Sequence, residues 1–323
     1  MSQIKESVRN AYGEALVELG KTNPAVVVLS ADVSASTRSI LFKAAFPERF
    51  FNLGVAEGNM TAVAAGLAAC GKIPFVDTFA VFATLRAGDP LRSLIAYGNL
   101  NVKIAAGYSG VSDSYDGASH QSVEDLALVR ALPNFTVMVV ADAHEARWAV
   151  PVAASLKGPV YIRLSRAEVP LLSQEPRPLV LGRAYLWRPG ADLSIVATGY
   201  MVHRALAAAE ILAGQGIAAR VIEIHTLKPL DTETLLRAAR ETGIVLTVEE
   251  HSIYGGLGSA VAEALATRGA LVPMRIMGFP DRFGESGGYD EVLDKMGLGV
   301  EHIVENALGL LKEKNRSKEK IGG

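Results

Sequence analysis

The stretch from Glu57 to Lys72 carries one charge at each end and none between them. Its central segment 61–70, Thr-Ala-Val-Ala-Ala-Gly-Leu-Ala-Ala-Cys, consists almost entirely of small and apolar residues. A helix that is apolar on every side is normally buried, so this segment predicts a helix packed inside the molecule. Glu57 at its start is then either a first-turn carboxylate that the helix dipole stabilises by ~0.3–1 kcal/mol, or an acid placed for chemistry.

Composition and charge limit the class of protein. The chain has 323 residues, 50% hydrophobic and 20% charged, which suits two α/β domains of ordinary size. A net charge of −2 does not indicate the basic surface that is typical of nucleic-acid-binding proteins. No uncharged apolar run reaches the ~20 residues of a membrane span, and the polar N-terminus does not resemble a signal peptide. The single cysteine, Cys70, excludes an intrachain disulfide, and we expect a buried thiol in a cytoplasmic protein.

Continuous apolar runs alternate with helical patterns through the first half of the chain. Such runs are typical of strands that are buried on both faces of a parallel sheet. Their order predicts a parallel-sheet domain over residues 1–172. In addition to the helix that begins at Glu57, we expect strands at 25–29, 73–76, 102–106, 135–140 and 159–164, and helices at 4–20, 37–45, 77–97, 123–131 and 143–156.

The second half of the chain repeats this alternation after a proline-rich segment, 173–190, that predicts a linker. A smaller α/β domain is expected over 191–315, followed by a charged tail at 316–323. The sequence thus predicts an α/β protein of two doubly wound domains. In the second domain we expect strands at 192–197, 218–223, 243–248 and 272–276, and helices at 202–214, 231–241, 257–267 and 300–313.

Polar residues follow several of the predicted strands. Asp32 and Ser36 come after the first strand, the long loop from Tyr108 to His120 follows another, and Arg166 follows the last strand of the first domain. Ligands bind at the carboxyl ends of strands in open α/β sheets. Arg9 lies in the first predicted helix, from which it can reach the same edge. A carboxylate, hydroxyls, a histidine and arginines together predict a site for an anionic small molecule.

Some of these residues have a simpler interpretation. The Asp32 loop can be only a turn and helix cap, and His120 can be only an exposed side chain. His120 can equally move protons, since its ordinary pKa near neutrality suits transfer in both directions. A pair of phenylalanines, Phe79 and Phe82, lies three residues apart, as expected on one face of a helix, where core packing is the usual role.

Two segments resemble cofactor-binding motifs of the C-terminal half of transketolase, and the resemblance extends over nearly the whole chain. Residues 54–60, Gly-Val-Ala-Glu-Gly-Asn-Met, are similar to the stretch whose glutamate activates thiamine diphosphate, which implies that role for Glu57. Residues 77–82, Asp-Thr-Phe-Ala-Val-Phe, are similar to the aromatic wall around the aminopyrimidine, which implies Phe79 and Phe82. The third aromatic position of that wall is Leu85 here.

Further segments resemble the family's substrate contacts. Residues 116–121, Asp-Gly-Ala-Ser-His-Gln, are similar to the segment whose aspartate and histidine contact substrate hydroxyls, which implies Asp116 and His120. Ser165-Arg166 is similar to the pair that binds the sugar phosphate. Arg9 and Ser36 correspond by position to two further phosphate contacts, with Asp32 in the same loop. Tyr108 stands where transketolases carry another phosphate-contacting histidine, which allows a non-phosphorylated or differently charged acceptor.

The resemblance implies a transketolase that transfers a two-carbon ketol unit from a ketose phosphate to an aldose phosphate. The family holds the diphosphate and Mg²⁺ with a Gly-Asp-Gly motif, which this sequence lacks. We therefore expect no metal ligand from this chain, and a partner N-terminal subunit that carries the motif, in an α2β2 heterotetramer with contact between copies of this chain. The alternatives are the beta subunit of a 2-oxo-acid dehydrogenase decarboxylase component and a non-catalytic scaffold subunit of the same fold.

Overall fold

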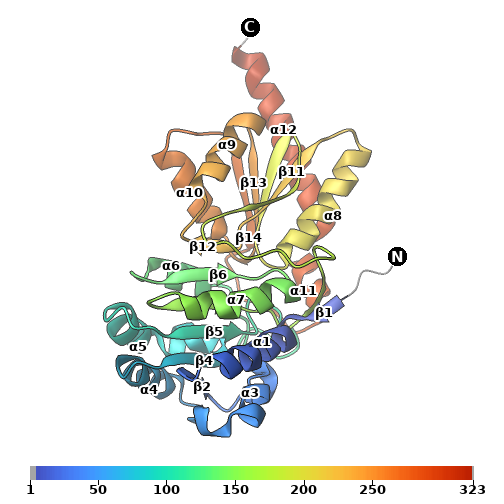
Figure 1. Cartoon of the computed structure of the whole chain (residues 1–323). Helices are drawn as coiled ribbons and strands as arrows, with labels where there is room; N and C mark the ends of the chain where they lie inside the picture. The colour runs from blue at the N-terminus through green and yellow to red at the C-terminus, as the bar shows by residue number, and fades with distance from the viewer. Residues whose placement is uncertain (1–4, 322–323) are drawn as a thin grey trace.

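The computed structural model describes residues 5–321, with side chains described through residue 314. Figure 1 shows two α/β domains, the first coloured blue to green and the second yellow to red, that pack directly on each other. The expected architecture, a parallel-sheet domain followed by a smaller α/β domain, is confirmed. Within the described part of the chain, no helix combines the length and apolar character needed to cross a membrane.

The first domain is built on a seven-stranded sheet with the order β12-β6-β7-β5-β4-β2-β3. Its central strands are buried along their full length, which is why their sequences are continuously apolar. The strands from this half are β2 (Val26–Ser30), β3 (Phe50–Asn52), β4 (Ile73–Phe79), β5 (Lys103–Gly107), β6 (Thr136–Val139) and β7 (Val160–Arg163). The principal helices are α1 (Val8–Thr22), α2 (Ser34–Thr37), α3 (Ile40–Ala45), α4 (Glu57–Ala69), α6 (Asp125–Ala131) and α7 (Ala143–Ser155).

The structure corrects two predicted helices of this domain. The helix expected over 77–97 does not begin at Asp77, because β4 continues to Phe79 and pairs in register with β5. Short π- and α-helical pieces follow: η2 (Phe82–Arg86), α5 (Gly88–Pro90) and η3 (Leu91–Ala96). The helix expected over 37–45 is divided at Arg38, whose left-handed backbone (φ 69°) ends α2.

The second domain contains a five-stranded sheet with the order β14-β13-β10-β11-β9. Its strands are β9 (Tyr185–Arg188), β10 (Leu193–Ala197), β11 (Ala219–Glu223), β13 (Val245–Ser252) and β14 (Met274–Phe279). Its helices are α8 (Met201–Gly214), α9 (Thr232–Thr242), α10 (Leu257–Thr267), α11 (Tyr289–Lys295) and α12 (Val300–Ile321). The helix expected to end at 313 continues, so the backbone of the predicted tail is helical to Ile321, while its side chains and residues 322–323 lie outside the described part.

The two domains are joined by more than a linker. β9 lies inside the predicted linker 173–190 and pairs antiparallel with β11, so this part of the segment belongs to the second sheet. β12 (Thr226–Lys228) comes from the second half of the chain but pairs antiparallel with β6 in the first sheet. β1 (Lys5–Ser7) pairs with β8 (Glu168–Pro170). One apolar cluster includes side chains of both domains, among them Val137 and Ile222.

A carboxyl pair is buried where the domains meet. Glu145 of α7 accepts a hydrogen bond from the Ala141 amide (2.8 Å), and Glu223 of β11 accepts one from the Trp187 indole (2.5 Å). Burial raises the pKa of Glu223 to about 7 and also raises that of Glu145, where the charge of Glu223 adds to the effect. One oxygen of each carboxyl group, Glu145 Oε1 and Glu223 Oε1, is buried without a hydrogen-bond partner among the described residues, so burial favours the protonated form of both groups.

We expect this pair to make the free energy of unfolding fall as pH rises. Because its pKa is raised in the folded state, the folded protein binds more protons than the unfolded chain between about pH 4.5 and 7. The stabilisation is complete below about pH 4.5, the ordinary pKa of an unfolded glutamate. As the pH rises from there to about 7, the free energy of unfolding falls by roughly 3 kcal/mol. Urea unfolding measures the difference between the free energies of unfolding at pH 5 and at pH 8. Glu145→Gln is expected to reduce this difference, because one of the two buried carboxyl groups no longer titrates, whereas Glu210→Gln at an exposed position leaves it unchanged.

Candidate active site

Four neighbouring parallel strands, β2, β4, β5 and β7, end at the same edge of the first sheet. The residues that follow them therefore converge, although they are far apart in the chain. Val33, Phe79, Phe82 and Tyr108 pack against one another at this edge. The strand order thus brings Phe79, Phe82 and Tyr108 to one place, although they follow different strands.

An aromatic stack forms the centre of this edge. The rings of Phe79 and Tyr108 are nearly parallel, with centroids 4.1 Å apart, and Phe82 lies 5.9 Å from Phe79. The imidazole of His120 meets the ring of Phe82 edge-on at 5.3 Å. Phe79 ends a strand, so the predicted pairing of the two phenylalanines on one helical face is wrong, but the rings still lie together. Tyr108 is the third aromatic of the group, whereas Leu85 is 54% exposed.

Glu57 is the first residue of α4, and only 4% of its side chain is exposed. Its carboxylate pairs with Arg86, whose Nη1 lies 3.2 Å from Oε1. The guanidinium carbon of Arg86 lies 3.7 Å from the ring centroid of Phe82, so Arg86 links the acid to the aromatic stack. Sequence reasoning missed Arg86. The available signal was its position four residues after Phe82, a spacing that places two side chains on one helical face.

One face of α4 remains exposed in the single chain. The prediction of a helix buried on every side is wrong here, because Ala62, Val63 and Gly66 are exposed while Met60 and Ala64 are buried. Cys70, expected to be buried, is also exposed. The helix is apolar all round, yet none of the residues that the structure describes covers its outer face. An apolar surface of this kind next to Glu57 is typical of a site for another molecule or chain.

Two arginines flank Tyr108. Arg9 donates to the Tyr108 hydroxyl (2.8 Å) and to the backbone carbonyl of Ser36 (3.0 Å). Arg166 donates to Asp113 (3.0 Å), and its guanidinium carbon lies 5.2 Å from the Tyr108 ring centroid. Two positive charges therefore lie close to the aromatic stack. Asp32 is exposed, and its carboxylate accepts a hydrogen bond from the Asn52 amide (2.7 Å).

The loop that carries His120 also contains two neighbouring carboxyl groups. Asp113 is fully buried, and burial together with the charge of Asp116 raises its pKa to about 6, although the charge of Arg166 opposes the rise. Asp116 itself is exposed. His120 Nδ1 lies 2.9 Å from the Ser119 hydroxyl. Asp113 is a further residue that sequence reasoning missed, because its importance comes from contact with Arg166, 53 positions away.

The arrangement can bind a flat ring beside a buried carboxylate and an anionic group between two arginines. Among residues 5–314, whose side chains the structure describes, no group of three or more His, Cys, Asp or Glu side chains is arranged to hold a metal ion. The side chains at this edge offer hydrogen bonding, aromatic stacking and proton transfer.

Comparisons with known proteins identify the family. The model of the transketolase pyrimidine-binding domain matches residues 5–170, and the model of the transketolase C-terminal domain matches residues 182–303. A 6-deoxy-6-sulfo-D-fructose transketolase subunit of Clostridium sp. is 43% identical over 95% of each chain. The solved structure of a split-gene transketolase, an inactive beta4 tetramer, is 50% identical with a TM-score of 0.88 over 95% of this chain and 98% of that one. The chain therefore belongs to the transketolase family.

Proposed function

We propose that this chain is the C-terminal subunit of a thiamine-diphosphate-dependent transketolase. It would take part in the transfer of a two-carbon ketol unit from a ketose to an aldose. The observation that carries the proposal is the single cluster formed by Glu57, Arg86, the aromatic stack and His120, with Arg9 and Arg166 beside it. These are side chains suited to a cofactor ring, to substrate hydroxyls and to a terminal anion.

The residues fit the pyrimidine half of thiamine diphosphate. Glu57 is a buried carboxyl group that can hydrogen-bond a ring nitrogen, and Phe79 and Phe82 offer flat apolar surface. When bound, this cofactor supplies the nucleophilic carbon that attacks a carbonyl and the electron sink for breaking the adjacent bond. Glu57 would hydrogen-bond a nitrogen of the cofactor ring through its carboxyl group. Arg86 contacts both the Glu57 carboxylate and the ring of Phe82 in this structure, so a bound ring would have to displace it from one of them.

The remaining residues act on the substrate. His120 moves protons to and from substrate oxygens, and Asp116 orients a donor hydroxyl. Arg9 and Arg166 neutralise the distal anionic group by charge-assisted hydrogen bonds, and Ser36 and Tyr108 hold Arg9 in place. Arginine binds phosphate and sulfonate alike through their oxygens, and a relative is named for a sulfo-sugar. The substrate class is therefore a sugar with a terminal anion.

Arg166→Ala is expected to raise the KM for an anionic acceptor about tenfold to a hundredfold, the range of one lost charge-assisted hydrogen bond. The KM for an uncharged aldose changes little, because no contact to its hydroxyls is removed. Steady-state kinetics with both acceptors measure the difference. An equal loss on the two acceptors would instead assign Arg166 a structural role through Asp113.

A partner subunit is part of the proposal. The partner carries the Gly-Asp-Gly motif and holds the diphosphate and Mg²⁺, and the assembly is an α2β2 heterotetramer in the cytoplasm with contact between copies of this chain. The exposed apolar face of α4 supports this, since it adjoins Glu57 and no element in the described part of this chain covers it. A tetramer of β chains that is inactive, as in the related split-gene structure, also agrees with a need for a second chain.

The test is a coupled assay of the chain together with a partner that carries Gly-Asp-Gly, with thiamine diphosphate and Mg²⁺. Ketol transfer between sugar phosphates or sulfo-sugars supports the proposal. Decarboxylation of 2-oxo acids would assign the chain to a dehydrogenase component instead. A stable complex without either activity would assign it a scaffold role.

A further inference from the structure

The second domain touches the loop that carries His120 through Glu250 of β13. Glu250 is 4% exposed, and its Oε1 accepts a hydrogen bond from the backbone amide of Val111 at 2.7 Å. Its Oε2 accepts a hydrogen bond from the Tyr289 hydroxyl, also at 2.7 Å. Both carboxylate oxygens are therefore used, one on the loop and one on the first residue of α11.

Gly110 makes this approach possible. Its backbone is left-handed (φ 61°), and a Cβ atom there would lie 2.3 to 2.7 Å from atoms of the Glu250 side chain. Any larger residue would displace Glu250 from the loop. The Ser122 amide donates to the Gly110 carbonyl (2.7 Å), so the same point also closes the loop on itself. At this position the loop and the second domain are in contact so close that only glycine leaves room for the Glu250 side chain.

A second contact lies just before α11. Gln121 Nε2 donates to the backbone carbonyl of Glu285 (2.9 Å), and the Gly287 amide donates to the carbonyl of Ser114 (3.0 Å). A Cβ atom on Gly117 would lie 2.5 Å from the Ser286 hydroxyl, so the loop and the segment before α11 are close here as well. The loop is thus held near both of its ends by one domain.

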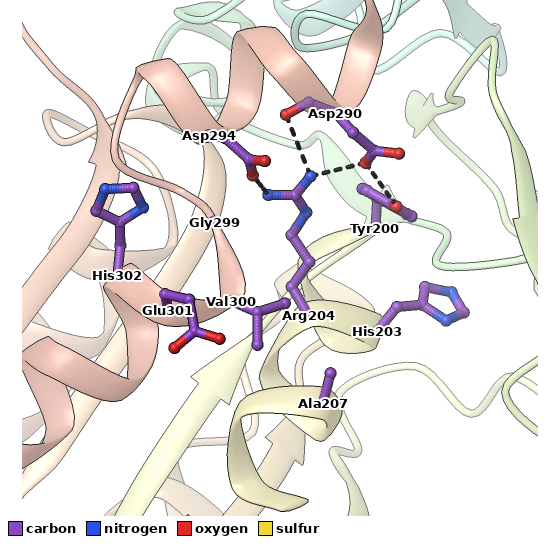
Figure 2. A pocket seen from close by; sticks show the side chains of 10 residues that line it. All are labelled: Tyr200, His203, Arg204, Ala207, Asp290, Asp294, Gly299, Val300, Glu301 and His302. Carbon is purple, nitrogen blue, oxygen red and sulfur yellow. Dashed lines mark hydrogen bonds and ion pairs between the residues drawn. The ribbon is translucent and has the colours of Figure 1, made fainter. Parts of the chain in front are cut away.

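The first turn of α11 is itself anchored, as Figure 2 shows. Arg204 of α8 donates to Asp290 (2.7 Å) and Asp294 (2.5 Å), and the Tyr200 hydroxyl donates to Asp290 (3.0 Å). These residues line a cavity of about 500 Å³, but the Arg204 guanidinium is already paired with two carboxylates. These ion pairs of Arg204 fix α11, the helix that begins at Tyr289. Tyr289 is the residue that donates a hydrogen bond to Glu250.

We propose that Glu250 is a positioning residue that holds the 109–122 loop so that His120 stays against the aromatic stack. This gives the second domain a role in the site of the first. The inference rests on the proposed function for its catalytic consequence, while the contact itself is a property of the chain. Glu250 does not lie among the residues proposed to touch cofactor or substrate.

Hydrogen exchange of the full chain tests the contact. In Glu250→Ala, exchange of the backbone amides at 109–117 is expected to be at least about tenfold faster, because the acceptor of Val111 is lost, while β5 and β10 are unchanged. Glu250→Gln keeps an acceptor oxygen and restores slow exchange. Tyr289→Phe, which removes one hydrogen bond to Glu250, gives an intermediate result and serves if Glu250→Ala does not fold. Equal exchange in all variants and in the exposed control Glu210→Ala would overturn the proposal.

Kinetics of the assembled enzyme test the catalytic consequence. Glu250→Ala is expected to lower kcat/KM for ketol transfer about tenfold, with rescue by Glu250→Gln, while thiamine diphosphate affinity is unchanged because Glu57 is untouched. A mobile loop with unchanged kcat/KM would overturn the positioning role. An inactive wild-type assembly would instead refute the proposed function, and the exchange result would still decide whether Glu250 holds the loop.

Discussion

Replacing Glu57 by glutamine is expected to lower the turnover of ketol transfer by about 10² to 10⁴-fold, the range typical of a lost acid–base group. Glutamine has the same shape and can still accept from Arg86, so the buried position at the start of α4 remains filled. Its amide cannot exchange a proton with the cofactor ring that is proposed to bind beside it. The measurement is kcat in the assembled enzyme, with the melting temperature and circular dichroism of the variant as the check on folding.

The matched control is Glu48→Gln, which removes a carboxylate at an exposed position of the same domain. It is expected to keep full activity. If Glu57→Gln retained near-wild-type turnover, Glu57 would be a first-turn carboxylate without a catalytic role, which is one of the two interpretations that its own stretch of sequence allows.

Replacing Arg163 by methionine is expected to lower the free energy of unfolding by about 3–5 kcal/mol, because it leaves a buried charge without its partner. Arg163 Nε donates to Asp125 Oδ2 (2.8 Å), and Asp125 is fully buried. Burial by itself raises the pKa of Asp125, but the charge and hydrogen bonds of Arg163 outweigh it, so that pKa is lowered. Arg163 also donates to the backbone carbonyls of Ser122 and Glu250, at 3.0 Å each, so its loss loosens the domain contact.

Urea unfolding at neutral pH measures the loss. The double variant Arg163→Met with Asp125→Leu is expected to recover part of the stability, since both charges are then removed and apolar side chains fill the space. Arg92→Met, at an exposed position, changes the free energy of unfolding by less than about 0.5 kcal/mol. A loss below about 1 kcal/mol for Arg163→Met would contradict the assignment of a buried, paired charge.

Much of the fold could be predicted because its signals are local. The run Val26–Leu29 predicts a buried strand from its own residues, since a strand covered on both faces needs apolar side chains throughout. The polar loops at the strand ends follow from the same pattern. The break at Arg38 and the extension of β4 to Phe79 could not be read in this way. Both depend on what the neighbouring elements require of the backbone.

Within the site, sequence reasoning could not identify contacts between residues that lie far apart in the chain. Tyr108 was assigned to a substrate position, yet its ring stacks on Phe79, which belongs to the adjacent strand β4. Asp113 gains its raised pKa only from burial and from charges that the fold brings near. The hydrogen bond from Val111 to Glu250 joins residues 139 positions apart, a contact that no spacing in the sequence reveals.

The sequence by itself determined the family, the two-domain α/β architecture and the order of the motifs, because apolar periodicity and short motifs are written in neighbouring residues. Only the tertiary structure decided which side chains meet. Strand order puts Phe79, Tyr108 and Arg166 at one edge, and domain packing puts Glu250 against the loop of His120. These contacts depend on burial and distance between remote segments, which are properties of the packed chain and not of any stretch of it.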